Sequence, residues 1–289
     1  MEARLVVQQR CALAEGPLWS PGESALYWVD IPNKRIHRHN AEDDAHRTWG
    51  LPSRASALTT RESGGLLLAT EEGFAHLDTT SGELSLVTPL ETHLPHNRSN
   101  EGKCDRAGRF WCGTMDDQEA GRTGALYRYD PDGGVTCHVT DVGISNTLAW
   151  SPDDRWLYFA DSLEQTIYRY PYDAVEGTLG DRGVFASTRG EAYTPDGSTV
   201  DRDGYLWNCQ WDGWRVVRYA PDGTIDRVVE LPVQRPTSCI FGGPDMSTLY
   251  ITSATIGLDE DALAKQPWAG GILALETDTQ GIPERPFLG

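Results

Sequence analysis

The sequence of 289 residues predicts an all-β fold, a six-bladed β-propeller of four-stranded antiparallel blades. A short pattern recurs six times, and each copy has a polar residue at its head and a hydrophobic strand a few residues later. The heads lie 41, 44, 46, 50 and 42 residues apart. A period of this size, made of short strands and Gly, Asp and Pro turns, is typical of radially repeated four-stranded sheets. The six heads are Glu15, Ser56, Asn100, Asn146, Asp196 and Ser238.

The fourth repeat shows how one blade is built. Its strands are expected, from the inside outwards, at residues 147–150, 156–160, 166–170 and 183–187. Pro152 and Asp153 predict the first hairpin, because Pro presets φ and Asp accepts a local backbone hydrogen bond. The first and fifth repeats follow the same order.

The two ends of the chain complete the last blade. The sixth repeat has little chain left for an outer strand, whereas residues 4–8 are strand-like and precede the first repeat. We therefore expect the N-terminal strand to close the ring, which removes an exposed sheet edge. A helical turn is expected at residues 259–265, where acidic residues open a short Ala/Leu run. The continuous repeat predicts one propeller domain over residues 1–289.

Composition narrows the classes of partner. The formal net charge of −18 argues against nucleic acid and anionic membrane surfaces, since binding phosphates requires clustered Lys and Arg. Small neutral solutes and divalent cations remain, and no obligate protein partner is evident. The N-terminus has no apolar signal region, no run is long enough for a membrane helix, and the six cysteines form no Cys-x-x-Cys pair. These features predict a cytoplasmic protein with reduced, mostly buried thiols.

The repeat heads predict a cation site. The first strand of each propeller blade lines the central channel, so the heads should converge on one axis. Two carboxylates brought together, Glu15 and Asp196, would raise the pKa of one of them unless a cation compensates. With Asn146 as a neutral oxygen ligand, the set favours Ca²⁺, Mg²⁺ or Mn²⁺ and leaves Zn²⁺ and Fe²⁺ open. Three protein ligands leave positions for water, as catalytic sites do. The alternative is a ring of hydrated polar residues.

Other chemistry-bearing residues have plainer interpretations. His37 and His39 alternate on a strand and could chelate a metal, but an exposed third strand with two solvated imidazoles is favoured. His93 and His96 precede the third repeat and could line the channel mouth. Three tryptophans could pack against a sugar ring, although packing between sheets is favoured; they are Trp111, Trp207 and Trp211. No Gly-x-Ser-x-Gly motif offers a hydrolase nucleophile.

Six segments together resemble the SMP-30/gluconolactonase/regucalcin family, closest in appearance to bacterial sugar lactonases. They run in order through nearly the whole chain: AEGPLW at 14–19, NRSNEGKCDRAGRFWCGTM at 97–115, ISNTLAWS at 144–151, PDGSTVDRDGYLW at 195–207, CIFGG at 239–243 and QPWAGGI at 266–272. The resemblance implies a six-bladed propeller with one catalytic divalent cation that hydrolyses aldonolactones, such as glucono-, xylono-, arabinono- or galactonolactone, to open-chain acids.

The resemblance also assigns roles to residues. The family's metal ligands fall on Glu15, Asn146 and Asp196, and its substrate-binding Arg and Asn fall on Arg98 and Asn100. The chain departs from the family in two places: Glu101, expected among the substrate-binding residues, stands where the family often has Asp, and Gln118 stands where some members are acidic. Both changes lie where substrate hydroxyls would be recognised, so they affect which lactone is bound more than which reaction is catalysed.

A mechanism follows as a hypothesis. The cation would bind the lactone carbonyl oxygen, and Asp196 would act as both ligand and general base toward the attacking water. Three alternatives remain at this stage: a non-catalytic calcium-binding regulatory propeller, a scaffold that binds proteins on its rim, and a hydrolase of another ester such as a phosphotriester.

Overall fold

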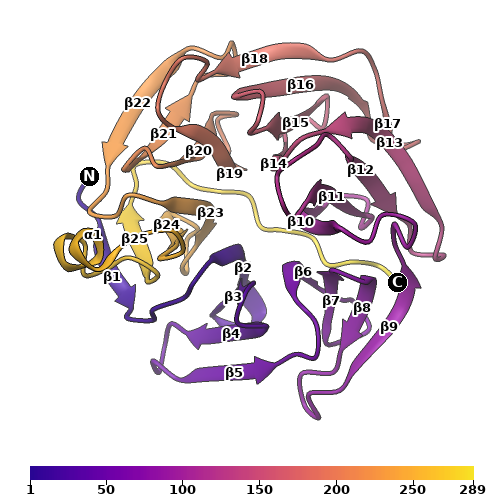
Figure 1. Ribbon diagram of the computed structural model, residues 1–289, viewed down its shortest axis with the longest axis horizontal. Helices are drawn as coiled ribbons and strands as arrows, with labels where there is room; N and C mark the ends of the chain where they lie inside the picture. Colours follow the sequence, from indigo (N-terminus) through magenta and orange to yellow (C-terminus); the bar gives the residue numbers. More distant parts are fainter.

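Each repeat forms one antiparallel sheet in the computed structural model, which describes residues 1–289. The six sheets stand around a common centre, and the predicted six-bladed β-propeller is confirmed (Figure 1). Blades one to six are numbered here by the order of their inner strands. Blade one contains β2 (Ala14–Ser20), β3 (Ala25–Asp30), β4 (Arg35–Asn40) and β5 (His46–Gly50), with a 3-10 turn at Pro21–Glu23. Blade two contains β6 (Ala55–Thr60), β7 (Leu66–Thr70), β8 (Gly73–Leu77) and β9 (Leu84–Pro89).

The remaining blades follow the same plan. Blade three contains β10 (Asn97–Cys104), β11 (Phe110–Asp116), β12 (Gly124–Tyr129) and β13 (Val135–Val142). Blade four contains β14 (Ser145–Trp150), β15 (Trp156–Asp161), β16 (Thr166–Asp173) and β18 (Gly183–Ser187), with the short β17 (Thr178–Leu179) beside β16. Blade five contains β19 (Thr194–Val200), β20 (Leu206–Trp211), β21 (Arg215–Tyr219) and β22 (Ile225–Glu230). Blade six contains β23 (Pro236–Gly242), β24 (Thr248–Ser253), β25 (Ile272–Glu276) and, as its outer strand, β1 (Arg4–Val7).

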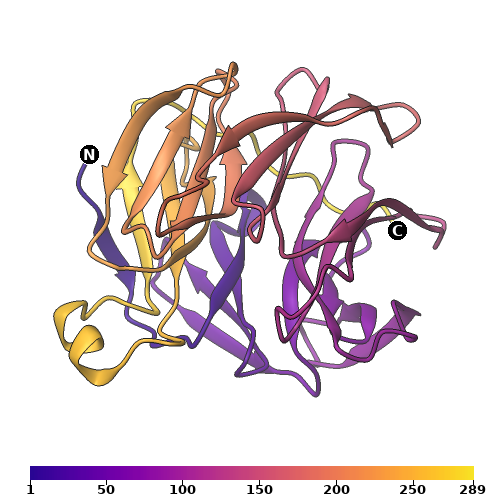
Figure 2. The same cartoon turned by 45° about the horizontal axis from the view of Figure 1, so that its top comes forward.

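The N-terminal strand closes the ring, as the sequence predicts. Strand β1 pairs antiparallel with β25, and Figure 2 shows the two side by side. The predicted helical turn is α1 (Glu260–Lys265), and its N-cap Asp259 accepts a hydrogen bond from the backbone N–H of Ala262 at 2.8 Å. This six-residue helix falls well short of the length that a membrane span requires, and no other helix in the structure meets it.

Apolar side chains fill the spaces between neighbouring sheets. Six hydrophobic clusters occur, and each contains residues from two adjacent blades. Trp111 lies in the cluster between blades three and four, and Trp207 in the cluster between blades five and six. The packing interpretation of these two indoles is therefore confirmed. The inner strands also carry buried polar side chains, among them Glu15, Asn146 and Asp196.

All six inner strands share one irregularity. The pairing of each inner strand with the second strand of its blade shifts near the head residue, which is the signature of a β-bulge. In blade four, Thr147 adopts φ +51°, a left-handed conformation that a β-branched residue seldom takes. In blade one, Gly16 occupies the same region at φ +53°. Bulges commonly lie beside active sites, because they change the direction in which a strand presents its side chains.

The C-terminal segment crosses the centre of the ring (Figure 1). Backbone hydrogen bonds tie it to several blades: Arg202 N–H donates to Gln280, Phe287 N–H to Thr60 and Leu288 N–H to Gly108. Phe287 is fully buried and stacks on Tyr129. The three hydrogen bonds involve the ends of the inner strands or the turns after them. Glu15, Asn100, Asn146 and Asp196 lie nearer the opposite ends of those strands, away from these hydrogen bonds.

Candidate active site

A cavity of about 390 Å³ lies where the inner strands begin. It is lined by five of the six residues that the sequence predicts for the site: Glu15, Asn146, Asp196, Arg98 and Asn100. They come from the inner strands of blades one, three, four and five. The remaining lining residues are Leu13, Met115, Glu119, Ile144, Ser162, Leu163, Thr194 and Trp211. The structure thus brings residues from distant stretches of sequence to one place.

Glu15 is held by the backbone around it. Its carboxylate oxygen Oε2 accepts a hydrogen bond from the N–H of Gly16 at 2.9 Å. The carbonyl of Ala14 accepts from Thr237 Oγ1 at 2.6 Å, which links blade one to blade six. A Cβ added to Gly16 would lie 3.0 Å from the carbonyl oxygen of Ser56, so only glycine fits comfortably between blades one and two.

Asp196 is fixed from both neighbouring strands. Its backbone carbonyl accepts hydrogen bonds from Thr147 Oγ1 at 2.6 Å and from Asn208 Nδ2 at 2.9 Å. Thr147 has the left-handed backbone described above, and in this strained conformation its hydroxyl points at blade five. The carboxylate of Asp196 is left for the cavity.

The two acidic residues lie in an unfavourable setting for negative charge. Glu15 is 8% exposed and Asp196 is 6% exposed, and neither forms an ion pair with a Lys, Arg or His. Burial raises the pKa of Glu15 well above its usual range, and the nearby charge of Asp196 raises it further. Burial likewise raises the pKa of Asp196, with an added contribution from Glu101. A cation in the cavity would relieve both penalties.

Asn146 is oriented by a serine that the repeat pattern does not include. Asn146 Nδ2 donates to Ser162 Oγ at 2.9 Å, and Ser162 Oγ donates to the carbonyl of Pro195 at 2.6 Å. Because the amide nitrogen is engaged in this chain, the carbonyl oxygen Oδ1 is the atom that Asn146 offers to the cavity. The same chain ties blade four to the strand that carries Asp196.

Arg98 is clamped on one side. Its Nε donates to Asp117 Oδ1 at 2.7 Å, and its Nη1 donates to Asn100 Oδ1 at 2.7 Å and to the carbonyl of Ser99 at 2.9 Å. Its Nη2 forms no hydrogen bond within the protein. Asn100 in turn donates from Nδ2 to the carbonyl of Ser145 at 2.8 Å. The free edge of the guanidinium is therefore available to a molecule in the cavity.

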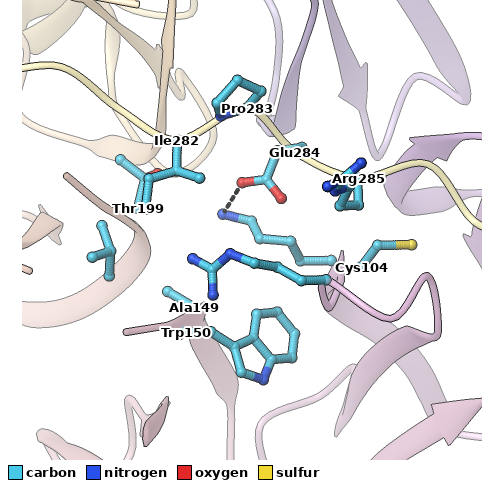
Figure 3. A pocket seen from close by; sticks show the side chains of 11 residues that line it. Cys104, Ala149, Trp150, Thr199, Ile282, Pro283, Glu284 and Arg285 are labelled. Atoms are coloured by element: carbon cyan, nitrogen blue, oxygen red, sulfur yellow. Dashed lines mark ion pairs between the residues drawn. The ribbon is translucent and has the colours of Figure 1, made fainter. Parts of the chain in front are cut away.

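Glu101 lies outside this cavity. It borders a smaller space on the other side of the bulge, together with Lys103 and Glu284 of the C-terminal segment. Figure 3 shows the ion pair between Lys103 Nζ and Glu284, which are 3.5 Å apart. Burial raises the pKa of Glu101 to about 7, while Lys103 lowers it. The structure thus places Glu101 toward the end of the ring that the C-terminal segment covers.

Several other sequence candidates lie away from the cavity. His93, His96 and Gln118 are exposed and do not line it. Trp211 does line it, with the Arg235 guanidinium 4.7 Å from the centre of its ring.

The expectation that His37 and His39 are solvated is wrong, because they are only 3% and 5% exposed, respectively. His37 stacks on Trp28, with ring centres 5.2 Å apart, and is covered by neighbouring segments.

Comparison with known proteins shows which family the chain belongs to. Residues 13–255 match the sequence profile of the SMP-30/Gluconolactonase/LRE-like region. The chain belongs to the SMP-30/gluconolactonase family. A 6-deoxy-6-sulfogluconolactonase of Pseudomonas putida is 37% identical over 287 residues, covering 99% of this chain and 98% of its own. A pentonolactonase of Haloferax volcanii is 37% identical over 292 residues, covering 98% of this chain and 97% of its own.

A solved structure of the family superposes closely on the fold. A calcium-binding protein, regucalcin, from Agrobacterium tumefaciens has a TM-score of 0.95 and 32% sequence identity, covering 99% of this chain and 97% of its own. Relatives within this one family are therefore described both as lactonases and as a calcium-binding protein.

The donors in this family member's cavity fit a divalent cation. Glu15 and Asp196 offer carboxylate oxygens, and Asn146 offers an amide oxygen turned inward by Ser162. The two buried carboxylates have no cationic partner in the protein. The site therefore has an excess of negative charge that a hard cation would neutralise. An all-oxygen donor set of this kind suits Ca²⁺, Mg²⁺ or Mn²⁺.

Proposed function

We propose that this chain hydrolyses the lactone of an aldonic acid to the open-chain acid, with a divalent cation bound by Glu15, Asn146 and Asp196. The observation that supports this most is the meeting of two buried, uncompensated carboxylates and an oriented amide in one open cavity beside Arg98. Membership of the family and the names of the lactonase relatives support the substrate class.

The reaction adds water to the lactone carbonyl carbon and breaks the bond from that carbon to the ring oxygen. A divalent cation at these ligands supplies Lewis-acid polarisation of a carbonyl oxygen. The carboxylate of Asp196 accepts the proton of the attacking water at an oxygen, and a proton is delivered to the departing ring oxygen. The products are a carboxylate and a hydroxyl group, so one proton is released per turnover near neutral pH.

Arg98 and Asn100 act on the substrate side of the cavity. Because Nη2 of Arg98 is free, it can donate to the ring or carbonyl oxygen of a bound lactone. Asn100 Oδ1 already accepts from Arg98, and its Nδ2 already donates to Ser145. We therefore assign Asn100 mainly to orienting Arg98, with one remaining lone pair for a substrate hydroxyl.

Charge favours a neutral sugar lactone. Arg98 is the only basic residue that lines the cavity, and Asp117 already pairs with it at 2.7 Å. The other charged lining residues, Glu15, Asp196 and Glu119, are acidic. A sulfonate or phosphate on the sugar would meet no unpaired cation except the metal. Unsubstituted five- or six-carbon aldonolactones are thus the expected substrates.

The test is a pH-indicator assay on a panel of lactones, with protein stripped by chelator and then reloaded with Ca²⁺, Mg²⁺, Mn²⁺ or Zn²⁺. We expect hydrolysis of at least one neutral aldonolactone that disappears on stripping and in Asp196→Ala. Full activity of metal-loaded Asp196→Ala would refute the assigned role, and no hydrolysis of any lactone by loaded wild-type protein would refute the function.

A second candidate is a non-catalytic cation-binding protein. It is favoured by the calcium-binding description of the similar Agrobacterium structure. The same ligands would then hold Ca²⁺ without turnover. The lactone panel separates the two functions, because the second one predicts tight Ca²⁺ binding and no proton release with any lactone.

A further inference from the structure

A second group of metal-ligating side chains lies outside the cavity, at the seam of the ring. Cys11, Asp30 and His37 each offer one ligand atom, and these three atoms lie within 4.8 Å of one another. All three residues are at most 3% exposed. None of them lines the candidate active site. Cys11 belongs to the segment that leads from β1 of blade six to β2 of blade one, whereas Asp30 ends β3 and His37 lies in β4 (Figure 1).

One ring nitrogen of His37 has no partner. Its Nδ1 lies 3.1 Å from Thr48 Oγ1 and 3.2 Å from His46 Nε2, so both contacts fall on one side of the imidazole. Its Nε2 is buried and forms no hydrogen bond. Metal-binding histidines characteristically use one nitrogen for the metal and donate from the other to a supporting group. Thr48 and His46 supply that support here and leave Nε2 for a ligand.

The surroundings of Cys11 disfavour a thiolate unless a cation is bound beside it. Its sulfur forms no hydrogen bond to a backbone group, and the buried indole Nε1–H of Trp28, which has no other acceptor, lies beside it. Without a cation, burial raises the pKa of the Cys11 thiol to about 12, and the charge of Asp30 raises it further. A bound metal would displace the thiol proton, and the resulting thiolate would accept the orphaned indole hydrogen.

Asp30 has coordination capacity left. Its Oδ2 accepts from Ala12 N–H at 3.3 Å and from Asn33 Nδ2 at 2.8 Å, whereas Oδ1 accepts only from Leu13 N–H at 3.2 Å. A carboxylate oxygen has two lone pairs, so Oδ1 can also bind a metal. Asp30 forms no ion pair with a basic residue, which leaves its buried charge without a cation.

We propose that Cys11, Asp30 and His37 form a structural metal site that takes Zn²⁺. One sulfur, one nitrogen and one carboxylate oxygen make a donor set that zinc accepts and that Ca²⁺ and Mg²⁺ do not. The metal would join the segment that closes the ring to the second and third strands of blade one. It would therefore stabilise the junction between blades six and one, and it would be separate from the site at Glu15, Asn146 and Asp196.

Cobalt substitution tests the site without any activity measurement. Protein stripped by chelator is titrated with Co²⁺, whose bond to a thiolate gives an intense charge-transfer absorption in the near ultraviolet. We expect this absorption in wild-type protein and in Asp196→Asn, because no cysteine lines the carboxylate cavity. We expect it to disappear in Cys11→Ser and to persist in Cys137→Ser, which removes an exposed thiol.

His37→Gln provides a second variant should Cys11→Ser not fold. It keeps the thiol but removes the nitrogen, and we expect Zn²⁺ affinity, measured by competition with a chelator, to fall by at least about tenfold. Absence of the absorption from wild-type protein overturns the proposal. So does its persistence in Cys11→Ser, or unchanged Zn²⁺ affinity in His37→Gln.

Discussion

Ser162 offers a sharp test of how the site is oriented. In the structure its hydroxyl accepts from Asn146 Nδ2 at 2.9 Å and donates to the carbonyl of Pro195 at 2.6 Å. Ser162→Ala removes both bonds in a side chain that is 5% exposed. The amide of Asn146 is then free to rotate, and in the rotated state it presents its NH₂ group, which repels a cation. We expect weaker cation binding with the carboxylates intact.

The magnitude has two parts. Loss of a group that supports a metal ligand typically costs roughly 10- to 100-fold in metal affinity, equivalent to about 1.4–2.7 kcal/mol. Leaving the Asn146 amide and the Pro195 carbonyl without their partner lowers the free energy of unfolding by about 1–3 kcal/mol. Both effects come from one hydroxyl, so they should occur together.

The assay is a Mn²⁺ titration in competition with a chelator, together with kcat/KM for a lactone substrate and urea unfolding of the stripped protein. Ser187→Ala is the control, since Ser187 is exposed and its hydroxyl, which donates to the carbonyl of Gln165 and accepts from the N–H of Arg189, does not contact the cavity residues. Wild-type Mn²⁺ affinity in Ser162→Ala, despite a loss of stability, would refute the orienting role.

Three further predictions concern other residues. Arg98→Lys should lower kcat/KM by about 100-fold while Mn²⁺ affinity stays near the wild-type value, because lysine lacks the planar guanidinium that Asp117 orients through Nε. An unchanged kcat/KM would show that Arg98 does not act on the substrate. Asp201→Ala should lower the free energy of unfolding, measured in urea, by at least about 2 kcal/mol, because several buried donors lose their acceptor; a loss under about 1 kcal/mol would contradict this. The buried Asp201 carboxylate accepts from Arg218 Nη2 at 2.7 Å and from Trp207 Nε1 at 3.0 Å, and its removal leaves Arg218 hydrogen-bonded to Asp226 alone at 2.9 Å. His138 packs against the buried indole of Trp111 with ring centres 4.7 Å apart, and burial lowers the pKa of His138 from 6.5 to about 4, so the imidazole is neutral when folded. The stability it contributes is present above about pH 6.5 and is lost as the pH falls toward 4, and His138→Gln should flatten this part of the unfolding profile; an unchanged slope would contradict the assignment.

The periodicity of the sequence is sufficient to predict the propeller, because each repeat carries its own strands and turns. It also places Glu15, Asn146 and Asp196 at equivalent positions of three inner strands, and the structure puts all three side chains in one cavity. Closure by the N-terminal strand could be predicted because blade six lacks an outer strand of its own. These features depend on spacing and local chemistry, which the sequence displays directly.

Spacing does not determine which way a side chain points at a bulge. Asn100 and Glu101 are adjacent, yet the first lines the cavity and the second faces the end that the C-terminal segment covers. A shift of one residue reverses the face of a strand, and the bulge in each inner strand makes such a shift. Ser162 was missed for a different reason, since it follows a second strand and lies outside the repeated pattern.

The burial of His37 also required the structure. Alternation along β4 puts His37 and His39 on one face of the strand, but it does not say what covers that face. His37 stacks on Trp28 and lies beside Cys11, which is 26 residues earlier in the segment between β1 and β2. Contacts between residues this far apart along the chain have no local signature in the sequence.

The most direct measurement of the central claim is the rate of lactone hydrolysis as a function of Mn²⁺ concentration, for stripped wild-type protein and for Asp196→Asn of verified fold. The proposed site predicts a saturable rise from no activity in the wild type, and neither tight Mn²⁺ binding nor turnover in the variant. Metal-independent hydrolysis by the wild type, or a variant that matches it at every Mn²⁺ concentration, would contradict the claim that these carboxylates hold the cation on which hydrolysis depends.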